Sequence, residues 1–542
     1  MAPSLTVTQQ ARMVAGLMAL LRAQNPPVAV DLIETHISFV LLAGERAYKI
    51  RKAVRLEFLD FTTLALRQHD CTEELRLNRR SAPALYLDVV PITGTPEQPA
   101  LGGCGPVIDW AVEMRAFAQS GLWDRLALAG GLSPAHIDAL VEALGAFHDA
   151  AAVARPADPR GRADRVRAPM LDNLRALAAV CTTPDERAGL AALGRWEALA
   201  FDTLRNGFDQ RLRDGWVREC HGDLHLGNVT QVDGTPTMFD CLEFSADLRW
   251  TDVMSDVAFL AMDLQSHGLA RLAQRFVNGC IERGDDHGGL EVLRYYTVHR
   301  ALVRAKVAAL RREQLAAASP GAGGPEAARA PGHYLDTALA NTNHTPPVLM
   351  LTHGCSGSGK TALTQSLLEL CGAIRIRADV QRKRLFGLPA LAHTDPHARA
   401  QVYSDEATAA THARLRELAA LALGSGYSVI LDATFLAHEQ RQRARLLADG
   451  LGVGFVIIDF HASAATLRER VRQRALRSDD ASEADLSVLQ AQLANVQPLR
   501  PDEAAAVFQF DAEPALAEAD MADRWAPLLQ RLGLAAGAVA PN

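Results

Sequence analysis

Residues 354–361, Gly-Cys-Ser-Gly-Ser-Gly-Lys-Thr, form the feature that most constrains how this chain folds. They follow an apolar run at 348–352 that predicts a strand, and a helical pattern begins at about residue 360. In this setting the glycines let backbone N–H groups turn inward around phosphates, and the positive end of the helix points at them. A glycine-rich turn without a ligand is the alternative, and the complete match argues against it. The predicted phosphate-binding loop consists of Gly354, Cys355, Ser356, Gly357, Ser358, Gly359, Lys360 and Thr361.

Three side chains predict that this loop binds ATP and Mg²⁺. We expect Lys360 to reach the β and γ phosphates, and Thr361 to ligate the metal. Asp432 closes the apolar run Val-Ile-Leu-Asp. Ligands of parallel sheets bind at such strand ends, so Asp432 is expected to hold Mg²⁺ through water.

Asp379 and Arg382 predict the side of the site that receives phosphate. An acid can accept the proton of an attacking hydroxyl while a nearby arginine orients an anionic substrate. The alternative for Asp379 is a helix N-cap.

Arg470, Arg474 and Arg477 lie at helical spacing and predict a basic face over the phosphates. A solvated arginine face is the alternative there.

Strand and helix patterns alternate after residue 345, which predicts an α/β domain with a parallel sheet and helices on both faces. About residues 345–515 resemble kinase-like P-loop proteins related to zeta toxins, phage polynucleotide kinases and gluconate kinases. The resemblance implies that Asp379 and Arg382 act on the acceptor, and that the arginine run belongs to a mobile lid.

A second motif, His-Gly-Asp-Leu-His-Leu-Gly-Asn, spans residues 221–228. Asp223 and Asn228 have the five-residue offset of a kinase catalytic loop, in which the acid accepts the acceptor's proton and the amide ligates metal. Asp240 lies twelve residues after Asn228 and matches the second metal-binding acid. The sequence therefore predicts a second ATP and Mg²⁺ site.

A strand lysine completes this second set. Lys49 is one of only five lysines among 56 basic residues, and a retained lysine is typical of a phosphate site. We expect it to contact the α and β phosphates and to pair with Glu74 or Glu73 of the next helix, although either glutamate also fits an exposed helix face. Residues 112–114, after a strand, fit a hinge that meets adenine.

A zinc site is the alternative reading of Cys220, His221 and His225, because His-x-x-x-His on a helix can share a metal. Gly222 and Asp223 between the histidines favour a loop instead. His221 is then expected to brace the catalytic loop.

About residues 30–310 resemble the aminoglycoside phosphotransferase family, in its His-Gly-Asp-x-x-x-x-Asn loop and later Asp. The resemblance implies an α+β protein-kinase-like fold and gives Asp256 the role of supporting that loop. Two features depart from the pattern: only the turn 43–46 is available to cover the phosphates, and no acidic stretch for a cationic aminoglycoside is evident. Together the halves resemble a bacterial family of fused phosphotransferase-like and P-loop proteins.

The predicted organisation is a phosphotransferase-like domain at 1–340, a linker region at 316–346 and a P-loop domain at 347–542. The small lobe is expected at about 30–115 and the large lobe at about 116–310. A chain of 542 residues is long enough to form several domains, each with its own hydrophobic core. The Ala-, Gly- and Pro-rich segment 316–331 indicates the linker.

Composition indicates a cytoplasmic protein without membrane spans. The eight cysteines include no Cys-x-x-Cys pair, no stretch of 18 apolar residues occurs, and the first 24 residues predict an amphipathic helix without a basic leader. After residue 345 the chain has 20 basic and 22 acidic residues, which argues against nucleic-acid binding.

Three functions are compatible with these motifs. The first is a kinase with two ATP sites that phosphorylates hydroxyls of small molecules. The second is one catalytic domain coupled to a nucleotide-responsive binding module. The third is a nucleic-acid 5′-hydroxyl kinase, suggested by the Asp-x-x-Arg pair.

Overall fold

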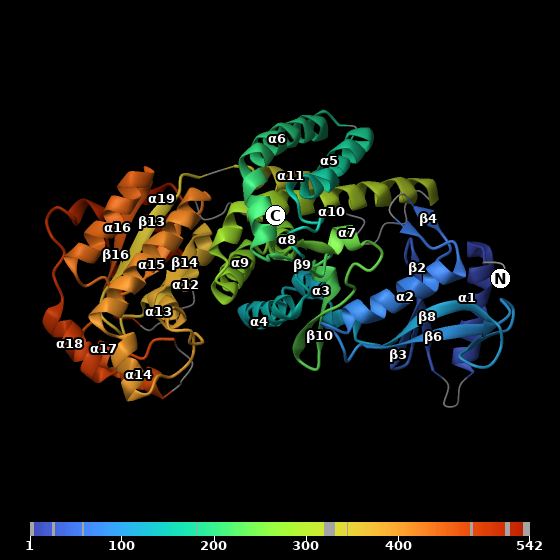
Figure 1. Cartoon of the computed structure of the whole chain (residues 1–542), viewed down its shortest axis with the longest axis horizontal. Coiled ribbons are helices and arrows are strands. Elements are labelled where there is room, and N and C mark those ends of the chain that lie inside the picture. The colour runs from blue at the N-terminus through green and yellow to red at the C-terminus, as the bar shows by residue number, and fades with distance from the viewer. Residues whose placement is uncertain are drawn as a thin grey trace. The chain divides into compact units, whose positions relative to one another are not determined.

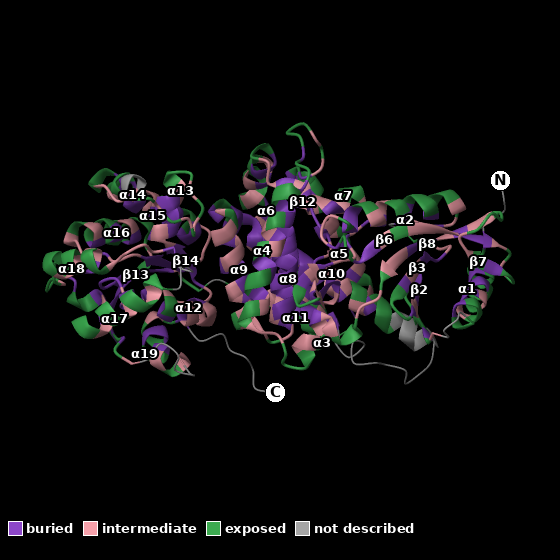
Figure 2. Cartoon of the chain, turned by 90° about the horizontal axis from the view of Figure 1, so that it is seen from below, coloured by how far each residue is buried: buried purple, intermediate pink, exposed green. Residues whose placement is uncertain are grey.

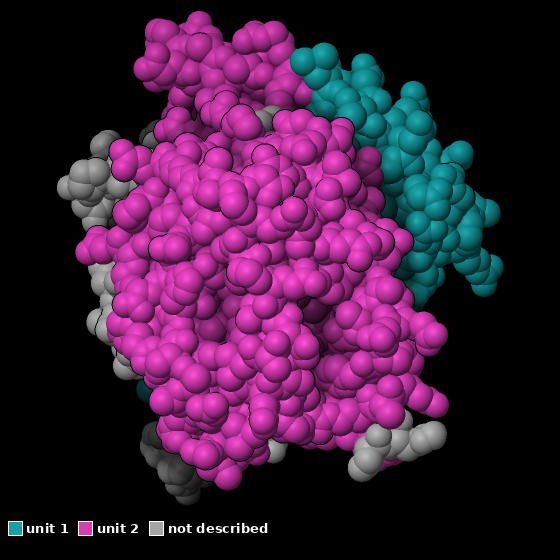
Figure 3. All heavy atoms as spheres, turned by 90° about the vertical axis from the view of Figure 1, so that its left-hand side faces the viewer, with its two compact units in different colours: residues 1–181, 198–263, 300–307 teal, residues 182–197, 264–299, 308–542 magenta. Residues whose placement is uncertain are grey.

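The structure is a computed structural model that describes residues 5–23, 28–56, 59–181, 183–318, 331–343, 345–476, 481–514 and 521–534. The chain forms two compact units, which Figure 3 shows in separate colours. Unit 1 comprises residues 1–181, 198–263 and 300–307. Unit 2 comprises residues 182–197, 264–299 and 308–542.

Unit 1 begins with a six-stranded antiparallel sheet, whose strands β2, β3, β6 and β8 are labelled in Figure 1. Its strand order is β1-β2-β3-β8-β6-β7. Its strands are β1 (Val30–Glu34), β2 (Ser38–Ala43), β3 (Arg46–Arg51), β6 (Tyr86–Gly94), β7 (Pro99–Leu101) and β8 (Val107–Arg115). The short hairpin β4 (Arg55–Leu56) and β5 (Leu59–Asp60) follows β3. Apolar residues of α1 (Val7–Arg22) share a core with this sheet, and Met13 and Leu17 are fully buried in it.

Helix α2 (Leu64–Asn78) follows this hairpin, and its residues Glu74 and Cys71 are buried.

The sheet with helices α1 and α2 is the α+β arrangement that the sequence analysis predicted, except that strand β1 was not predicted. Because β1 pairs with β2, the loop 35–37 joins the first two strands, as the phosphate-covering loop does in kinases. The turn 43–46, to which the sequence assigned that position, instead joins β2 to the lysine strand β3.

The rest of unit 1 is mainly helical around two small strand pairs. Helices η1 (Gln119–Gly121), α3 (Trp123–Leu128), α4 (Pro134–Ala150), α5 (Ala163–Val180), η2 (Leu226–Asn228), α7 (Ala246–Arg249) and α8 (Val253–Ser266) belong here. The pairs are β9 (Val217–Glu219) with β12 (Trp250–Asp252), and β10 (Val229–Val232) with β11 (Thr235–Met238). Helices α6 (Pro184–Arg213), α8 and α10 (Leu290–Ala318) contribute residues to both units.

Unit 2 contains a five-stranded parallel sheet in the order β14-β15-β13-β16-β17. The strands are β13 (Val348–His353), β14 (Ile374–Arg377), β15 (Val429–Asp432), β16 (Gly454–His461) and β17 (Val507–Asp511). Continuous apolar sequences explain their burial: every residue of β13 and β15 is buried (Figure 2). The sequence prediction of an α/β domain with a parallel sheet is confirmed.

The remaining elements of unit 2 are helices. They are α9 (Ala270–Gly284), η3 (His287–Gly289), α11 (Pro331–Ala340), α12 (Lys360–Cys371), α13 (Ala378–Leu385), α14 (Pro396–Val402), α15 (Asp405–Gly424), α16 (His438–Leu451), α17 (Ala464–Ala475), α18 (Leu486–Asn495), η5 (Ala504–Ala506) and α19 (Ala522–Leu532). Trp525 of α19 stacks on Phe510 in the core, with ring centroids 4.2 Å apart.

The boundary between the units differs from the predicted domain boundary. Residues 264–299 and α11 pack within unit 2, although the sequence placed them in the first domain or the linker. Tyr334 and Leu335 of α11 are buried, so part of the predicted linker is a packed helix. Residues 319–330 lie outside the described residues.

In the portion of the chain that the structure describes, we find no helix with the length and hydropathy needed to cross a bilayer.

Candidate active sites

The predicted phosphate-binding loop joins β13 to α12, and its glycines are sterically required. Gly354, Gly357 and Gly359 have φ of +139°, +85° and +82°, values that side chains disfavour. A Cβ atom on Gly357 would lie 2.7 Å from the main-chain oxygen of Leu467. The backbone can therefore adopt this tight loop only with glycine at these positions.

Lys360 is held by the loop alone. Its Nζ donates to the main-chain oxygens of Gly354 and Cys355, both at 2.9 Å, and to Oγ of Ser358 at 3.3 Å. Within the described residues no carboxylate pairs with it. Burial lowers the pKa of the ammonium. A buried cation with only neutral partners is suited to a phosphate anion.

Thr361 and Asp432 meet beside this lysine. The Thr361 hydroxyl donates to Oδ2 of Asp432 at 2.6 Å, although the residues are 71 positions apart. The first turn of α12 positions the threonine and the end of β15 positions the acid. Hydroxyl and carboxylate oxygens are ligands that Mg²⁺ prefers, so this pair fits the expected metal.

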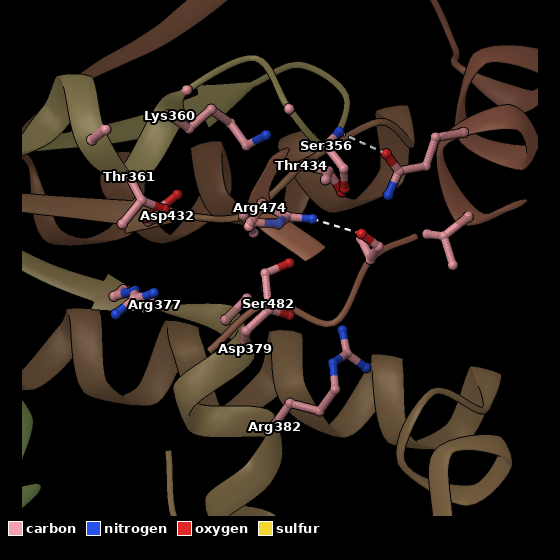
Figure 4. A pocket seen from close by; sticks show the side chains of 18 of the residues that line it. Ser356, Lys360, Thr361, Arg377, Asp379, Arg382, Asp432, Thr434, Arg474 and Ser482 are labelled. Atoms are coloured by element: carbon pink, nitrogen blue, oxygen red, sulfur yellow. Dashed lines mark hydrogen bonds between the residues drawn. The ribbon is translucent and has the colours of Figure 1, made fainter. Parts of the chain in front are cut away.

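A cavity of about 410 Å³ opens beside the loop (Figure 4). Lys360, Thr361 and Asp432 line one side, and Asp379 and Arg382 of α13 line the other. The N-cap of α13 is Arg377, and Asp379 lies in its first turn. The N-cap alternative for Asp379 is therefore wrong.

Arg382 lies mostly buried on this second side of the cavity. One of its terminal nitrogens donates to Oγ1 of Thr408 at 3.1 Å, and its guanidinium lies 4.9 Å from the ring centre of Tyr403. In the described parts of the chain it has no carboxylate partner, and its Nε has no hydrogen-bond partner. Its charge is therefore available to an anionic group in the cavity.

Sequence reasoning missed two other residues on this side, Tyr403 and His412. The Tyr403 hydroxyl is buried without a hydrogen-bond partner among the described residues, and burial together with Asp379 raises its pKa to about 12. Burial, with Arg382 nearby, lowers the pKa of His412 to about 4. Both are polar, uncharged groups at neutral pH. No short motif marks them, because Tyr403 lies in the turn between α14 and α15 and His412 lies in α15, both distant in sequence from Asp379.

Arg470 and Arg474 of α17 also line the cavity. Arg470 donates to the main-chain oxygens of Ala512 and Pro514, at 2.8 and 3.0 Å, and Arg474 donates to that of Ala484 at 2.7 Å. Both are half-buried, so neither belongs to a freely solvated face. Arg477, the third arginine of the predicted face, lies outside the described residues.

In unit 1, Lys49 lies between two carboxylates. Its Nζ is 2.8 Å from Oε1 of Glu74 and 2.5 Å from Oδ1 of Asp240. Burial opposes the charged form, but Asp240 and Glu74 outweigh it and raise the pKa of the lysine. Glu73 instead pairs with Arg76 and Arg249. The structure thus selects Glu74 from the two glutamates that the sequence left open.

The second predicted loop brings Asp223 and Asn228 together. The Asn228 amide donates to the main-chain oxygen of Asp223 at 2.9 Å and to its Oδ2 at 3.1 Å. Burial raises the pKa of the Asp223 carboxyl, but His225 and then His221 outweigh it and lower the pKa to about 2. Asp223 is therefore ionised at neutral pH, as a proton acceptor must be.

Asp256 supports the loop 221–228 through hydrogen bonds to its backbone. Its carboxylate accepts the N–H groups of His221 and Gly222, both at 2.9 Å, and lies 3.1 Å from Nε2 of His148. Nε2 of His221 lies 2.9 Å from the main-chain oxygen of Phe239, the residue before Asp240. His221 thus ties the two parts of the site together.

The zinc alternative does not fit the geometry. Residues 221–225 form a loop and not a helix. The ring of His225 accepts the N–H of Gly227, whereas His221 contacts Phe239. The two rings are therefore engaged in different contacts.

The hinge predicted at 112–114 lies inside β8, where Val112 pairs with Lys49.

Sequence reasoning also missed a buried ionic cluster beside Lys49. Arg51 lies between Asp70 at 2.6 Å, Glu74 at 2.6 Å and Glu243. Arg51 follows Lys49 by two residues on the same face of β3, and Asp70 precedes Glu74 by one helical turn, which is the only local signal.

The two sites and their folds define a chain with a kinase-like phosphotransferase domain and a kinase-like P-loop domain. Residues 112–294 match the model of a family described as "Phosphotransferase enzyme family", and residues 349–499 match a model described as "AAA domain".

The chain is 32% identical over 472 residues to an uncharacterized protein of Mycobacterium tuberculosis (strain H37Rv) and to one of Mycobacterium bovis. Each alignment covers 86% of this chain and 90% of the relative. The chain belongs to this bacterial family, and in it an aminoglycoside phosphotransferase-like domain is fused to a P-loop kinase-like domain.

Two solved structures are also similar. A gluconokinase from Sinorhizobium meliloti 1021 shares 24% identity, with 35% of this chain and 98% of that chain covered and a TM-score of 0.25. A choline/ethanolamine kinase family protein from Mesorhizobium loti shares 16% identity, with 62% and 99% covered and a TM-score of 0.37.

Proposed function

We propose that this protein is an ATP- and Mg²⁺-dependent kinase with two phosphotransfer centres, each acting on a hydroxyl of a small molecule. The observation that carries the proposal is the unit 2 cavity. It has a phosphate-binding loop and the Thr361–Asp432 pair on one side, and Asp379 and Arg382 on the other.

In the unit 2 centre, the acceptor hydroxyl attacks the γ-phosphorus while the bond from that phosphorus to the β–γ bridging oxygen breaks. The hydroxyl proton passes to the carboxylate of Asp379, and ADP leaves. Lys360 balances the charge on the phosphates. Thr361 and Asp432 would hold Mg²⁺, which would supply neutralisation of phosphate charge. Arg382 orients the acceptor through an anionic group.

Arg470 and Arg474 occupy the lid position of this centre. Their guanidinium groups are fixed by main-chain oxygens on the wall of the cavity, so little entropy is lost when phosphate charge is presented to them. We assign them the stabilisation of charge during transfer.

In the unit 1 centre, Asp223 accepts the proton of the acceptor hydroxyl. Asn228 and Asp240 would hold Mg²⁺, and Lys49, positioned by Glu74, contacts the α and β phosphates. The contact of Lys49 with Asp240 puts the phosphate-binding cation beside the metal-binding acid.

The near-balance of charge after residue 345, with 20 basic and 22 acidic residues, favours a small-molecule acceptor over a nucleic-acid end. We place the protein in the cytoplasm, because ATP is available there and the cysteines show no disulfide framework.

One observation favours a second candidate, in which unit 1 binds nucleotide without transferring phosphate. The loop 35–37, which joins the first two strands, contains no glycine to approach the phosphates closely. Unit 2 would then be the catalytic part, and unit 1 a nucleotide-responsive module.

A transfer assay with γ-labelled ATP and a mixture of sugars, polyols and hydroxy acids tests the proposal. Labelled products should appear with the wild type. Products that disappear in Asp379→Ala belong to unit 2, and products that disappear in Asp223→Ala belong to unit 1. If only Asp379→Ala lost products, the second candidate would replace the first.

A further inference from the structure

Helix α9 lies in the part of the sequence that matches the phosphotransferase family, yet it packs against the P-loop sheet. The family match ends at residue 294, and the P-loop match begins at 349. Residues 264–299 nevertheless belong to unit 2. Arg275 of α9 lies 2.9 Å from Glu369 of α12, which anchors the helix beside the sheet.

The first contact that concerns the active site is at the free edge of β14. This strand is the edge of the parallel sheet, and within the described ranges of the chain it pairs with β15 alone. The N–H of Arg375 points away from β15 and donates to Oδ1 of Asn278 at 2.7 Å. Asn278 is buried and thus replaces the missing neighbouring strand. Two residues further on, Arg377 ends β14 and caps α13.

The second contact is at the end of α9, where Asp285 holds the opposite face of α13. Asp285 has φ of +52° and ends α9 in the left-handed conformation. Its Oδ1 accepts from Nε2 of Gln381 at 3.0 Å and from Nη1 of Arg384 at 2.9 Å. Arg384 also donates to the main-chain oxygens of Glu282 and Arg283, at the negative end of α9.

These two contacts bear on the residues that face the cavity. Asp379 and Arg382 line the cavity, whereas Gln381 and Arg384 of the same eight-residue helix contact Asp285. A helix this short has little stability of its own, so its orientation depends on such contacts.

We propose that Asn278 and Asp285 are positioning residues of the P-loop centre, and that α9 is therefore a structural part of that active site. Neither residue is placed in contact with substrate. Asn278 fixes the edge strand before α13, and Asp285 fixes the face of α13 opposite to Asp379 and Arg382. The catalytic part of this statement rests on the proposed function, whereas the structural part does not.

Hydrogen exchange and transfer kinetics on the full chain test this. Asp285→Gly removes both carboxylate oxygens and tolerates the left-handed conformation, and Asn278→Leu removes the acceptor oxygen at similar volume. Asn278→Asp retains an acceptor and serves as the conservative variant. Glu291→Gln, an exposed acid in the first turn of α10, is the matched control.

We expect exchange of the amides of residues 378–385 to rise at least about tenfold in Asp285→Gly and Asn278→Leu, with residues 360–371 unchanged. Asn278→Asp and Glu291→Gln should exchange like the wild type. In an Asp223→Asn background, transfer of γ-label to the sugar, polyol and hydroxy-acid mixture should fall about tenfold to hundredfold in kcat, with KM for ATP unchanged.

Unchanged exchange of residues 378–385 in both Asp285→Gly and Asn278→Leu would overturn the proposal. So would a loss confined to KM for ATP, or uniform exchange along the whole of unit 2. If the wild type transfers no label at all, the proposed function fails, and the exchange data still decide whether α9 holds α13.

Discussion

Nζ of Lys49 and Oδ1 of Asp240 lie 2.5 Å apart, although 191 positions separate the residues in the sequence. The ammonium expected to bind phosphate and the carboxylate expected to bind metal thus neutralise each other. Nucleotide and Mg²⁺ would supply each group with a new partner of opposite charge. Binding of nucleotide and Mg²⁺ would therefore replace the Lys49–Asp240 ion pair by a lysine–phosphate and a carboxylate–metal interaction, at little electrostatic cost.

Asp240→Asn removes the metal-binding charge at this pair. We expect transfer assigned to unit 1 to fall at least about 100-fold, because the amide does not neutralise the lysine or hold Mg²⁺ tightly. Asp233→Asn is the matched control, since Asp233 also has a positive φ (+50°) but is exposed and pairs with Arg115. Equal activity of the two variants in the transfer assay would contradict this role.

Lys360→Met removes the loop cation at similar volume. Because its partners among the described residues, the main-chain oxygens of Gly354 and Cys355 and the hydroxyl of Ser358, all belong to the loop, the fold should persist, while affinity for Mg·ATP at unit 2 falls about 100-fold. Isothermal titration of the full chain carrying Asp240→Asn isolates this site. Lys306→Met, in α10, is the control. Retained tight binding in the Lys360 variant would argue against the loop as the nucleotide site.

Asp379→Asn tests the proton acceptor of unit 2. We expect kcat to fall about 10²- to 10⁴-fold with KM for ATP little changed, because an amide cannot take the hydroxyl proton. Asp405→Asn, in the exposed first turn of α15, is the control. A changed KM with unchanged kcat would assign Asp379 to binding and not to catalysis.

Asp256 makes the stability of unit 1 depend on acid pH. Burial raises the pKa of its carboxyl, but the hydrogen bond and charge of His148, with His221, lower it to about 2 in the folded state. The folded-state pKa lies below the unfolded value of about 3.9, so this stabilisation is present above pH 4 and is lost as pH falls through 2. It amounts to about 2 to 3 kcal/mol.

Asp256→Asn should therefore lower Tm near pH 7, and the difference from the wild type should shrink below pH 4. Thermal unfolding between pH 2.5 and 7 measures this. Asp233→Asn, at an exposed ion pair, should leave Tm nearly unchanged across the range. A Tm difference for Asp256→Asn that stayed constant down to pH 2.5 would refute the charge-based explanation.

The sequence predicted those parts of the sites that local spacing encodes. The loop 354–361 carries its own geometry, because the glycines, Lys360 and Thr361 are adjacent in sequence. Asp432 was predictable because it ends an apolar strand, and carboxyl ends of parallel strands share one edge of the sheet. Lys49 and the pair of glutamates were also predicted, and packing of α2 then selected Glu74.

Contacts between distant segments were not predictable in this way. The packing of Asn278 on β14 joins residues 97 positions apart, and hydrophobic periodicity carries no information about such a pairing. Arg51 appeared to be an ordinary strand arginine, because its three carboxylate partners come from α2 and the segment after Asp240. Helix α11 was assigned to a linker because it directly follows an Ala-, Gly- and Pro-rich segment.

The central claim, two independent phosphotransfer centres, is tested most directly by the γ-labelled ATP assay on the wild type, Asp223→Ala, Asp379→Ala and the double variant. We predict that each single variant loses a different set of labelled products, and that the double variant loses all of them. If either single variant alone abolished every product, or if the double variant retained them, the claim of two independent centres would be contradicted.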